Sequence, residues 1–239
     1  MLKSKWKMIV LVIVSIIVIA SLCFKGWVYY KYYQIYNDIK ENDISALYKA
    51  EKIDISVKTQ IEGYTEFSNS WFSVQTPYGS INDFEERMVG EIPNKKIYTN
   101  AENNTFISIF NGKLGGDSFF DKDVVKELND KFNTNIITSK DFYDAMYQKD
   151  YSNINYLSSY NKTTSYAILL VQRSTSTVSG KLYYFENANN YGYIMYDRYP
   201  VIRIFDQTGK FVSEIAITNG DEVMDLNIMK NIVGSIIIK

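Results

Sequence analysis

The chain has few residue types that could perform catalysis. None of its 239 residues is histidine, which removes Ser-His-Asp and Cys-His catalysis and zinc held by imidazole. Its one cysteine, Cys23, lies inside an apolar run near the N-terminus. The rest of the chain therefore has no disulfide, no thiol nucleophile and no thiolate metal site. We expect no catalytic residue, no metal and no cofactor, and the side chains left to consider are serines, acids and tyrosines.

One serine lies in a pattern known from penicillin-recognising enzymes. Residues 159–162 read Ser-Tyr-Asn-Lys and match the Ser-x-x-Lys element of those enzymes. Residues 4–7 in the N-terminal tail match the same element, and the accompanying Ser-Asp-Asn and Lys-Thr-Gly elements are missing. We therefore interpret Ser159 as a solvated loop serine and not as a nucleophile.

Pairs of carboxylates could hydrolyse glycosidic bonds, which requires two acids about 5–10 Å apart. The candidate pairs are Glu85 with Glu86, Asp121 with Asp123, and Asp141 with Asp144. Each pair lies in a polar stretch or in the first turn of an expected helix, where acids already favour the helix dipole. Asp117 could join Asp121 and Asp123 as calcium ligands, but the spacing lacks the glycine and terminal glutamate of an EF-hand.

Tyrosines crowd a segment in which successive strands are expected. Those assigned to a possible binding face are Tyr184, Tyr191, Tyr193, Tyr196 and Tyr199. Side chains alternate between the two faces of a strand, so about half of these rings must face away from the core. Exposed tyrosine offers a large contact area with a polar tip, which is typical of binding surfaces. Alternatively, the rings are ordinary half-buried strand residues in a chain that has 21 tyrosines.

An apolar N-terminal segment predicts a helix that spans a membrane. Lysines precede an uncharged run over residues 8–24, and few cations follow it closely. Trp6 and Trp27 bracket this run and would lie about 31 Å apart on a helix, which matches a hydrocarbon core of roughly 30 Å. The expected membrane anchors are Trp6, Lys7, Lys25 and Trp27. The lysine distribution favours a cytoplasmic N-terminus and a C-terminal part outside the cell membrane.

These signals divide the chain into four parts. They are a cytoplasmic tail (1–7), a membrane helix in contact with the lipid bilayer (8–29), a helical juxtamembrane stalk (30–60) and an extracytoplasmic domain (61–239). In the stalk, apolar residues repeat at helical spacing at Tyr29, Tyr32, Tyr33, Tyr36 and Ile39. We expect this stripe to pack on the domain; alternatively, it contacts a partner helix.

Two other interpretations of the N-terminal segment place the domain on the same side. A signal peptidase could cleave after Ala20, because Val18 and Ala20 fit the recognition positions tolerably. The apolar run beyond Ala20 and its aromatic flank favour retention instead. A lipoprotein would need a small residue before Cys23, where Leu22 stands.

Apolar periodicity and turn residues predict an α+β domain. Strands are expected at residues 71–76, 96–99, 105–110, 182–186, 193–196, 201–205 and 211–217. Helices are expected over residues 43–49, from Asp117 or Ser118 to Phe132, from Ser139 to Met146, and over residues 223–236. Periodicity does not decide between strand and helix for residues 166–171. Sequential short strands with inserted helices imply an antiparallel sheet flanked by helices.

The order of these elements resembles the PsbP-type fold, an antiparallel sheet with helices on both faces. The resemblance covers residues 62–239 and rests on residues 72–77, 183–185, 202–206 and 232–236. The membrane helix departs from the lipoprotein members of that family. The resemblance implies a binding or accessory role and transfers no site residues.

The sequence therefore predicts a membrane-anchored, non-enzymatic domain that binds a protein or envelope partner. The abundance of Ile, Asn, Lys and Tyr with three prolines is typical of AT-rich bacterial genomes. Nucleic acid is a poor partner, because the net charge is −1 and no basic block stands out. One alternative is a carboxylate-dependent hydrolase of the cell envelope. Another is an accessory subunit of a membrane complex, whose spanning helix carries the contacts.

Overall fold

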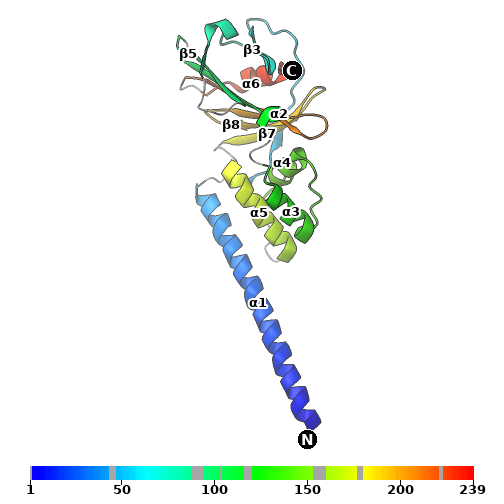
Figure 1. Cartoon of the computed structure of the whole chain (residues 1–239). Helices are drawn as coiled ribbons and strands as arrows, with labels where there is room; N and C mark the ends of the chain where they lie inside the picture. The colour runs from blue at the N-terminus through cyan, green and yellow to red at the C-terminus, as the bar shows by residue number, and fades with distance from the viewer. Residues whose placement is uncertain are drawn as a thin grey trace.

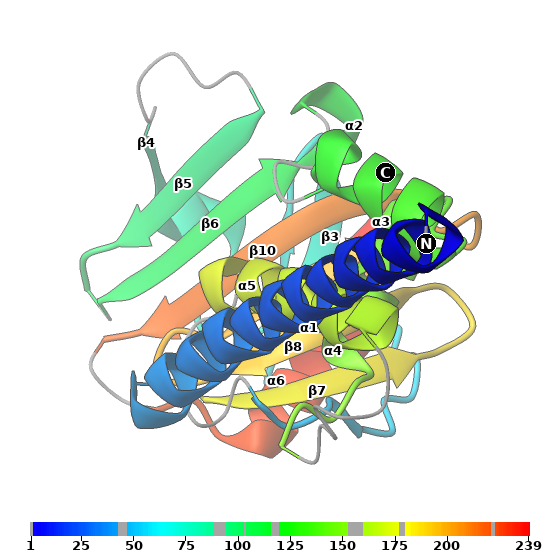
Figure 2. The same cartoon turned by 90° about the horizontal axis from the view of Figure 1, so that it is seen from below.

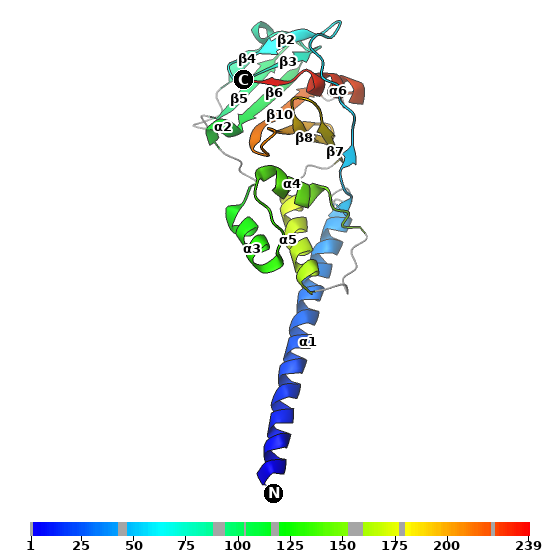
Figure 3. The ribbon, with the colours of Figure 1, turned by 90° about the vertical axis from the view of Figure 1, so that its right-hand side faces the viewer.

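One long helix ends against a layered arrangement of helices and two β-sheets (Figure 1). The structure, a computed structural model, describes residues 2–42, 47–87, 94–102, 104–115, 120–152, 160–176, 180–220 and 223–239. The N-terminus lies at the free end of the long helix, and the C-terminus lies with the sheets at the opposite end (Figures 1 and 3).

Helix α1 (Leu2–Asn42) has two parts with different surroundings. Residues 6–27 are exposed throughout. By length and composition the helix is compatible with a membrane span or a signal sequence. From Tyr32 onward one face enters the domain, and Tyr32 and Ile39 are only 1% and 8% exposed. Tyr32 and Ile39 of the expected helical stripe therefore pack on the chain's own domain, whereas Tyr33 is exposed.

Three further helices surround the end of α1 and cover one face of the large sheet (Figure 2). They are α3 (Lys122–Phe132), α4 (Ser139–Tyr147) and α5 (Tyr160–Ser176). Helix α5 packs against the other three helices, α1 included. Residues 166–171, for which the sequence left strand or helix open, thus form the middle of the central helix. We call these elements the helical layer.

The large sheet is mixed. Its strands are β1 (Glu51–Lys52), β4 (Glu85–Arg87), β5 (Lys95–Asn100), β6 (Thr105–Asn111), β7 (Lys181–Glu186), β8 (Tyr191–Tyr196), β9 (Val201–Phe205) and β10 (Phe211–Asn219). They are ordered β1-β7-β8-β9-β10-β6-β5-β4. All neighbours are antiparallel except β1 and β7, so the predicted antiparallel sheet needs this correction. Helices α1 and α5 both run toward the sheet (Figure 1), so β1, which follows α1, and β7, which follows α5, are parallel.

The helical stalk predicted over residues 30–60 differs from the structure after Asn42. The helix predicted over residues 43–49 falls mostly on residues 43–46, which lie outside the described residues. Strand β1 follows, and the buried Ile53 and Ile55 flank Asp54 at the two-residue spacing of extended chain. This part of the predicted stalk belongs to the folded domain.

A second sheet covers the other face of the large sheet. It contains β2 (Thr65–Ser68), β3 (Phe72–Thr76) and β11 (Ile237–Ile238), in the order β11-β3-β2, and it packs there with α6 (Leu226–Gly234). The closing helix was predicted to reach Ile236 but ends at Gly234. A Cβ at Gly234 would lie 2.3 Å from the Ser56 carbonyl oxygen, so glycine permits this close approach. The chain then pairs with β3 as β11.

Several boundaries follow local chemistry. Helix α3 was predicted to begin at Asp117 or Ser118, but it begins at Lys122, because Asp121 caps it by accepting bonds from the backbone of Asp123 and Val124. Gly209 adopts a φ of +81°, as expected for the turn before β10, and the β9–β10 register shifts just after this turn, between Phe211 and Ser213. The remaining elements are 3-10 helix η2 (Ile81–Asp83) and α2 (Gly112–Gly115). The α+β class and the four-strand meander are confirmed.

Candidate functional site

The tyrosines predicted to form a binding face are divided between the two faces of the large sheet. Tyr184, Tyr191 and Tyr193 pack toward the helical layer, whereas Tyr196 packs toward the second sheet. Tyr193 is 0% exposed and therefore cannot belong to an exposed face. Tyr199, between β8 and β9, is 48% exposed. The side chains alternate as expected, but both faces of the sheet are covered.

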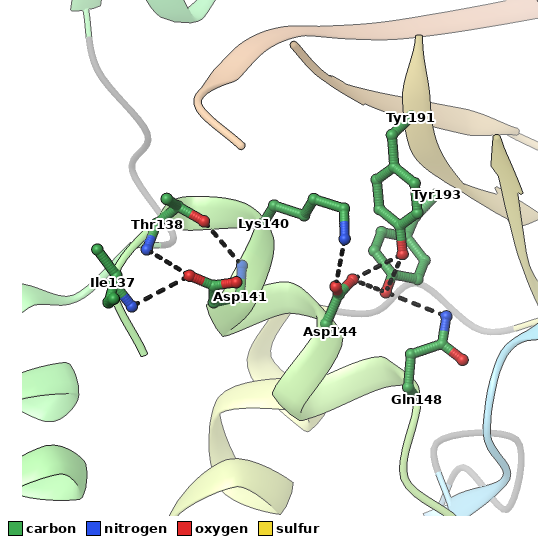
Figure 4. Close-up of polar contacts among 8 residues, drawn as sticks. All are labelled: Ile137, Thr138, Lys140, Asp141, Asp144, Gln148, Tyr191 and Tyr193. Carbon is green, nitrogen blue, oxygen red and sulfur yellow. Dashed lines mark hydrogen bonds and ion pairs between the residues drawn. The ribbon is translucent and has the colours of Figure 1, made fainter. Parts of the chain in front are cut away.

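The tyrosines under the helical layer belong to a polar cluster around Asp144 of α4 (Figure 4). The hydroxyl groups of Tyr191 and Tyr193 each donate a hydrogen bond of 2.6 Å to Oδ1 of Asp144. The Nζ of Lys140 lies 2.6 Å from Oδ2 of Asp144 and 3.9 Å from the Tyr191 ring centroid. The Nε2 of Gln148 donates to the Tyr193 hydroxyl at 3.3 Å. Residues 140, 144 and 148 are four apart, so one face of α4 and its end meet β8.

Burial keeps these two tyrosines protonated. It raises the pKa of Tyr191 far above its ordinary value, and the hydrogen bond to Asp144 adds to the effect. Burial, followed by the charge of Asp144, raises the pKa of Tyr193 in the same direction. A phenol that holds its proton near neutral pH donates hydrogen bonds and is a poor base. The cluster is therefore suited to docking α4 on the sheet.

The neighbouring acid Asp141 makes different contacts. Its Oδ2 accepts hydrogen bonds from the backbone of Thr138 at 2.8 Å and of Ile137 at 3.2 Å, and Thr138 Oγ1 accepts from the Asp141 backbone at 3.2 Å. Partial burial opposes ionisation, but these hydrogen bonds outweigh it and lower the pKa of Asp141. The carboxylates of Asp141 and Asp144 point toward different partners in Figure 4. This predicted pair does not converge on one site.

Glu85, Glu86 and Asp121, which were also predicted as possible site acids, lie at exposed positions. Glu86 pairs with Lys96 at 3.0 Å, and Glu85 lies 3.9 Å from Arg87 on the same edge strand. Asp121 is occupied as the cap of α3. Asp117 and Ser159 lie outside the described residues. Within the described ranges, no three acids or cysteines gather closely enough to hold a metal ion.

Arg203, in the middle of β9, is buried next to the cluster at 3% exposure. Its Nε donates to Oε2 of Glu214 at 2.6 Å, and its Nη1 donates to the Tyr147 hydroxyl at 2.9 Å. The Tyr147 ring in turn meets the Tyr193 ring at 4.9 Å between centroids. The sequence analysis missed this residue, although a cation inside the run Val-Ile-Arg-Ile-Phe indicates a buried partner.

Arg173 of α5 is 0% exposed and links three segments. Its Nη1 donates to the carbonyl groups of Met146 at 3.4 Å and Lys149 at 3.3 Å, and its Nη2 donates to the carbonyl of Tyr48. These acceptors lie at the end of α4 and in the segment that follows α1. Arg173 continues the apolar stripe of α5 at helical spacing, and this position is a signal that the sequence analysis did not use.

These contacts form a continuous path from α1 to the large sheet. Tyr32 and Ile39 of α1 share a buried core with Leu169 of α5. Arg173 then connects α5 to the end of α4, and Tyr147 connects α4 to Arg203 in the sheet. The long helix is therefore packed and hydrogen-bonded into the domain.

A cavity of about 510 Å³ opens at one end of the sheet strands, between the turns that follow β7 and β9 and strand β11. Its polar wall carries Lys113, Asn189, Asn190, Asp206 and Gln207, and its apolar wall carries Val212 and residues 236–238. Two of these side chains already form hydrogen bonds within the cavity walls: Asn190 donates to the Ile236 carbonyl and Gln207 to the Ala188 carbonyl, both at 3.3 Å. Among the described lining residues the one acid is Asp206. A mixed cavity of this size fits a small ligand or a side chain of a partner.

No family model, curated protein or solved structure matches the chain. Its function is therefore inferred from its own chemistry and geometry.

Proposed function

We propose that the chain is a single-pass membrane protein whose folded domain acts outside the cytoplasm as a non-enzymatic binding or accessory module. The supporting observation is that one unbroken helix is exposed over residues 6–27, apolar over residues 8–24, and packed into the domain along one face from Tyr32 onward. A bilayer supplies the apolar surroundings that the first part lacks. The second part holds the domain on its anchor without a flexible linker.

Retention of the apolar segment is favoured over cleavage. Cleavage after Ala20 would leave Leu22, Phe24 and Trp27 at the start of a water-exposed helix. These side chains are 63%, 56% and 57% exposed, so the mature protein would present a large apolar patch to water. In a bilayer the same residues lie in lipid or at its interface.

Binding is favoured over catalysis. The predicted acid pairs are caps, surface ion pairs or docking contacts, and the cavity offers one described acid with a carboxylate already engaged by the Thr208 and Lys210 backbone. An envelope hydrolase would need a second acid beside it. The proposed resemblance to PsbP-type domains also favours a binding role.

The anchor and its orientation can be tested on intact spheroplasts of cells that produce the full chain. We expect external protease to digest the domain and to leave a small membrane-protected fragment that contains residues 8–29. The mass of the full-length protein should include the N-terminal segment, and alkaline carbonate should not extract it. Protection of the domain in spheroplasts, with digestion after lysis, would refute the orientation; a mature chain that begins near Ser21 would refute the anchor.

A second candidate is an accessory subunit that binds its partner through the membrane helix. It is favoured by Tyr30 and Tyr33, which are 57% and 52% exposed on α1 beside the buried stripe. Replacing residues 8–28 with an unrelated spanning helix, together with Tyr30→Ser and Tyr33→Ser, separates the two candidates. A module that binds through its domain keeps its crosslinked partner after this exchange, whereas a subunit that binds through its helix loses it.

A further inference from the structure

We propose that the end of the helical layer nearest the exposed part of α1 binds the phosphate group of an anionic phospholipid, through Lys149 and Lys162, whose ammonium groups both lie near the Tyr166 ring. This inference rests on the proposed membrane anchor. It adds a specific lipid contact made by the folded domain, separate from the spanning helix.

Two ammonium groups from different segments meet at one aromatic ring. The Nζ of Lys149, just after α4, lies 4.5 Å from the centroid of the Tyr166 ring, and the Nζ of Lys162, in the first turn of α5, lies 5.6 Å from it. The two ammonium groups carry like charges that repel each other, and Lys149 is also half-buried. Burial, followed by the charge of Lys162, lowers the pKa of Lys149 to about 8. An anion beside both groups would relieve the repulsion and accept charge-assisted hydrogen bonds.

Acids are scarce in the sequence after Asp150. Residues 151–185 contain no aspartate or glutamate, although this segment carries Lys162, Arg173 and Lys181. The nearest acid before it, Asp150, accepts a hydrogen bond from the Ser152 backbone at 2.9 Å. Helix α3, by contrast, alternates lysines with acids and includes the Lys131–Glu127 ion pair at 2.9 Å. Within the helical layer, positive charge is therefore concentrated along α5.

A third cation extends this positive region into the protein. The Arg173 guanidinium lies 5.6 Å from the Tyr151 ring centroid, and the Tyr151 and Tyr166 rings are 6.0 Å apart. Cations and rings thus follow one side of α5 from its buried end to its exposed start. A surface with this gradient attracts an anion toward the exposed end, where Lys162 stands.

The location selects a lipid as the source of the anion. Helix α5 begins at the end of the helical layer that lies beside the exposed part of α1 (Figures 1 and 3). Burial of α1 starts at Tyr32, which lies about 8 Å beyond Trp27 along the helix axis. Trp27 is an expected interface residue, so the start of α5 lies near the level of the lipid head groups, within reach of long lysine side chains. Anionic head groups and a basic rim are complementary in charge.

The test is a titration of the full chain in a neutral detergent. Short-chain phosphatidylglycerol, phosphatidylcholine with the same acyl chains, and inorganic phosphate are added separately, and the rise in unfolding temperature with concentration gives an apparent Kd. The variant is K149Q/K162Q. The matched control is K126Q/K131Q on α3, which removes the same charge from the same layer. K162Q alone, at an exposed position, is included in case the double variant loses its fold.

We expect phosphatidylglycerol to stabilise the wild-type chain and phosphatidylcholine to have little effect. The affinity should fall about fivefold for each lysine removed from the site and should change less than twofold in the control. Equal loss in both double variants, or no phosphatidylglycerol effect in the wild type, overturns the site. An equal effect of inorganic phosphate overturns the lipid as the ligand. These outcomes do not depend on the topology measured in spheroplasts, so the anchor and the lipid site can fail separately.

Discussion

The two faces of the large sheet are held by different kinds of contact. Toward the second sheet and α6, the buried side chains are mainly isoleucine, valine, phenylalanine and methionine. Toward the helical layer, the buried side chains include five tyrosines, which are Tyr32, Tyr143, Tyr147, Tyr151 and Tyr193. The two buried charged side chains among the described residues, Arg173 and Arg203, lie on this side as well. One core is apolar, and the other is aromatic and hydrogen-bonded.

This difference separates stability from orientation. Apolar burial is non-directional, so the second sheet gains stability from the area that it buries. Hydrogen bonds depend on distance and angle, so the contacts of Asp144 and Arg203 fix how the helical layer sits on the sheet. The helical layer contains the end of α1. The polar core therefore sets the angle between the anchor and the sheets.

The largest effect should come from the apolar core. Phe67 is 0% exposed, and its ring meets those of Phe84 and Tyr98 at 5.2 and 5.0 Å between centroids. Phe67→Ala should lower the free energy of unfolding by about 3–5 kcal/mol, measured by urea unfolding of the full chain in neutral detergent. Phe67→Leu should cost clearly less. A loss below about 1 kcal/mol for Phe67→Ala would show that this core is not closely packed.

A somewhat smaller effect is expected where charge is buried in the helix-covered core. Arg203→Met leaves Glu214 and the Tyr147 hydroxyl without their donor and should cost about 3 kcal/mol in the same measurement. The double variant Arg203→Met with Glu214→Leu should recover much of the loss, because it removes the stranded carboxylate. If the double variant were no more stable than the single one, the ion pair would not explain the cost.

The hydroxyl groups of two tyrosines on opposite faces of β8 offer a finer comparison. The Tyr193 hydroxyl donates to the Asp144 carboxylate, whereas the Tyr196 hydroxyl donates to the Met224 carbonyl. Tyr193→Phe should cost about 2 kcal/mol, because bonds to charged groups are stronger, and Tyr196→Phe about 1 kcal/mol. The reverse order in urea unfolding would contradict the division between the two cores.

The smallest effect is a pH dependence that belongs to the helical layer. The pKa of Lys149 is about 8 in the folded chain, whereas the ordinary value of 10.5 applies to the unfolded chain. Between these values the unfolded chain binds more protons, so the free energy of unfolding should rise with pH, by less than about 1 kcal/mol up to pH 9.5 after allowing for solvent screening. Lys149→Gln should abolish this rise. Measurements should stay below pH 9.5, because raised tyrosine pKa values remove stability as the pH passes 10.

Local signals in the sequence predicted much of the fold that depends on neighbouring segments, although β2 and β4, which pair with β3 and β5, were missed. The meander from β7 to β10 was predicted because its strands alternate and its turns contain residues such as Gly209. Strands β1 and β11 were missed, since each is two residues long and pairs with a segment more than 120 residues away in the chain. Pairing at that range leaves little trace in a short window of sequence.

The candidate site was harder to predict than the fold. Alternation placed Tyr193 and Tyr196 on opposite faces of β8, but it gave no information about what covers each face. The second sheet and the helical layer cover the two faces of the large sheet, so Tyr193 is buried and is not part of an exposed tyrosine face. Arg203 was a usable signal, because a cation within an apolar strand must find a partner. Its partners, Glu214 and Tyr147, come from segments whose proximity depends on the whole fold.

The unbroken course of α1 has a mechanical consequence in a membrane. A helix without a hinge transmits its tilt in full to whatever is packed on its end. Tilt depends on the match between the apolar length and the bilayer thickness. In a thinner bilayer the helix would tilt further, and the sheets, which lie beyond its end, would move sideways. The lipid surroundings would thereby set the direction in which the cavity at the ends of the sheet strands faces a partner.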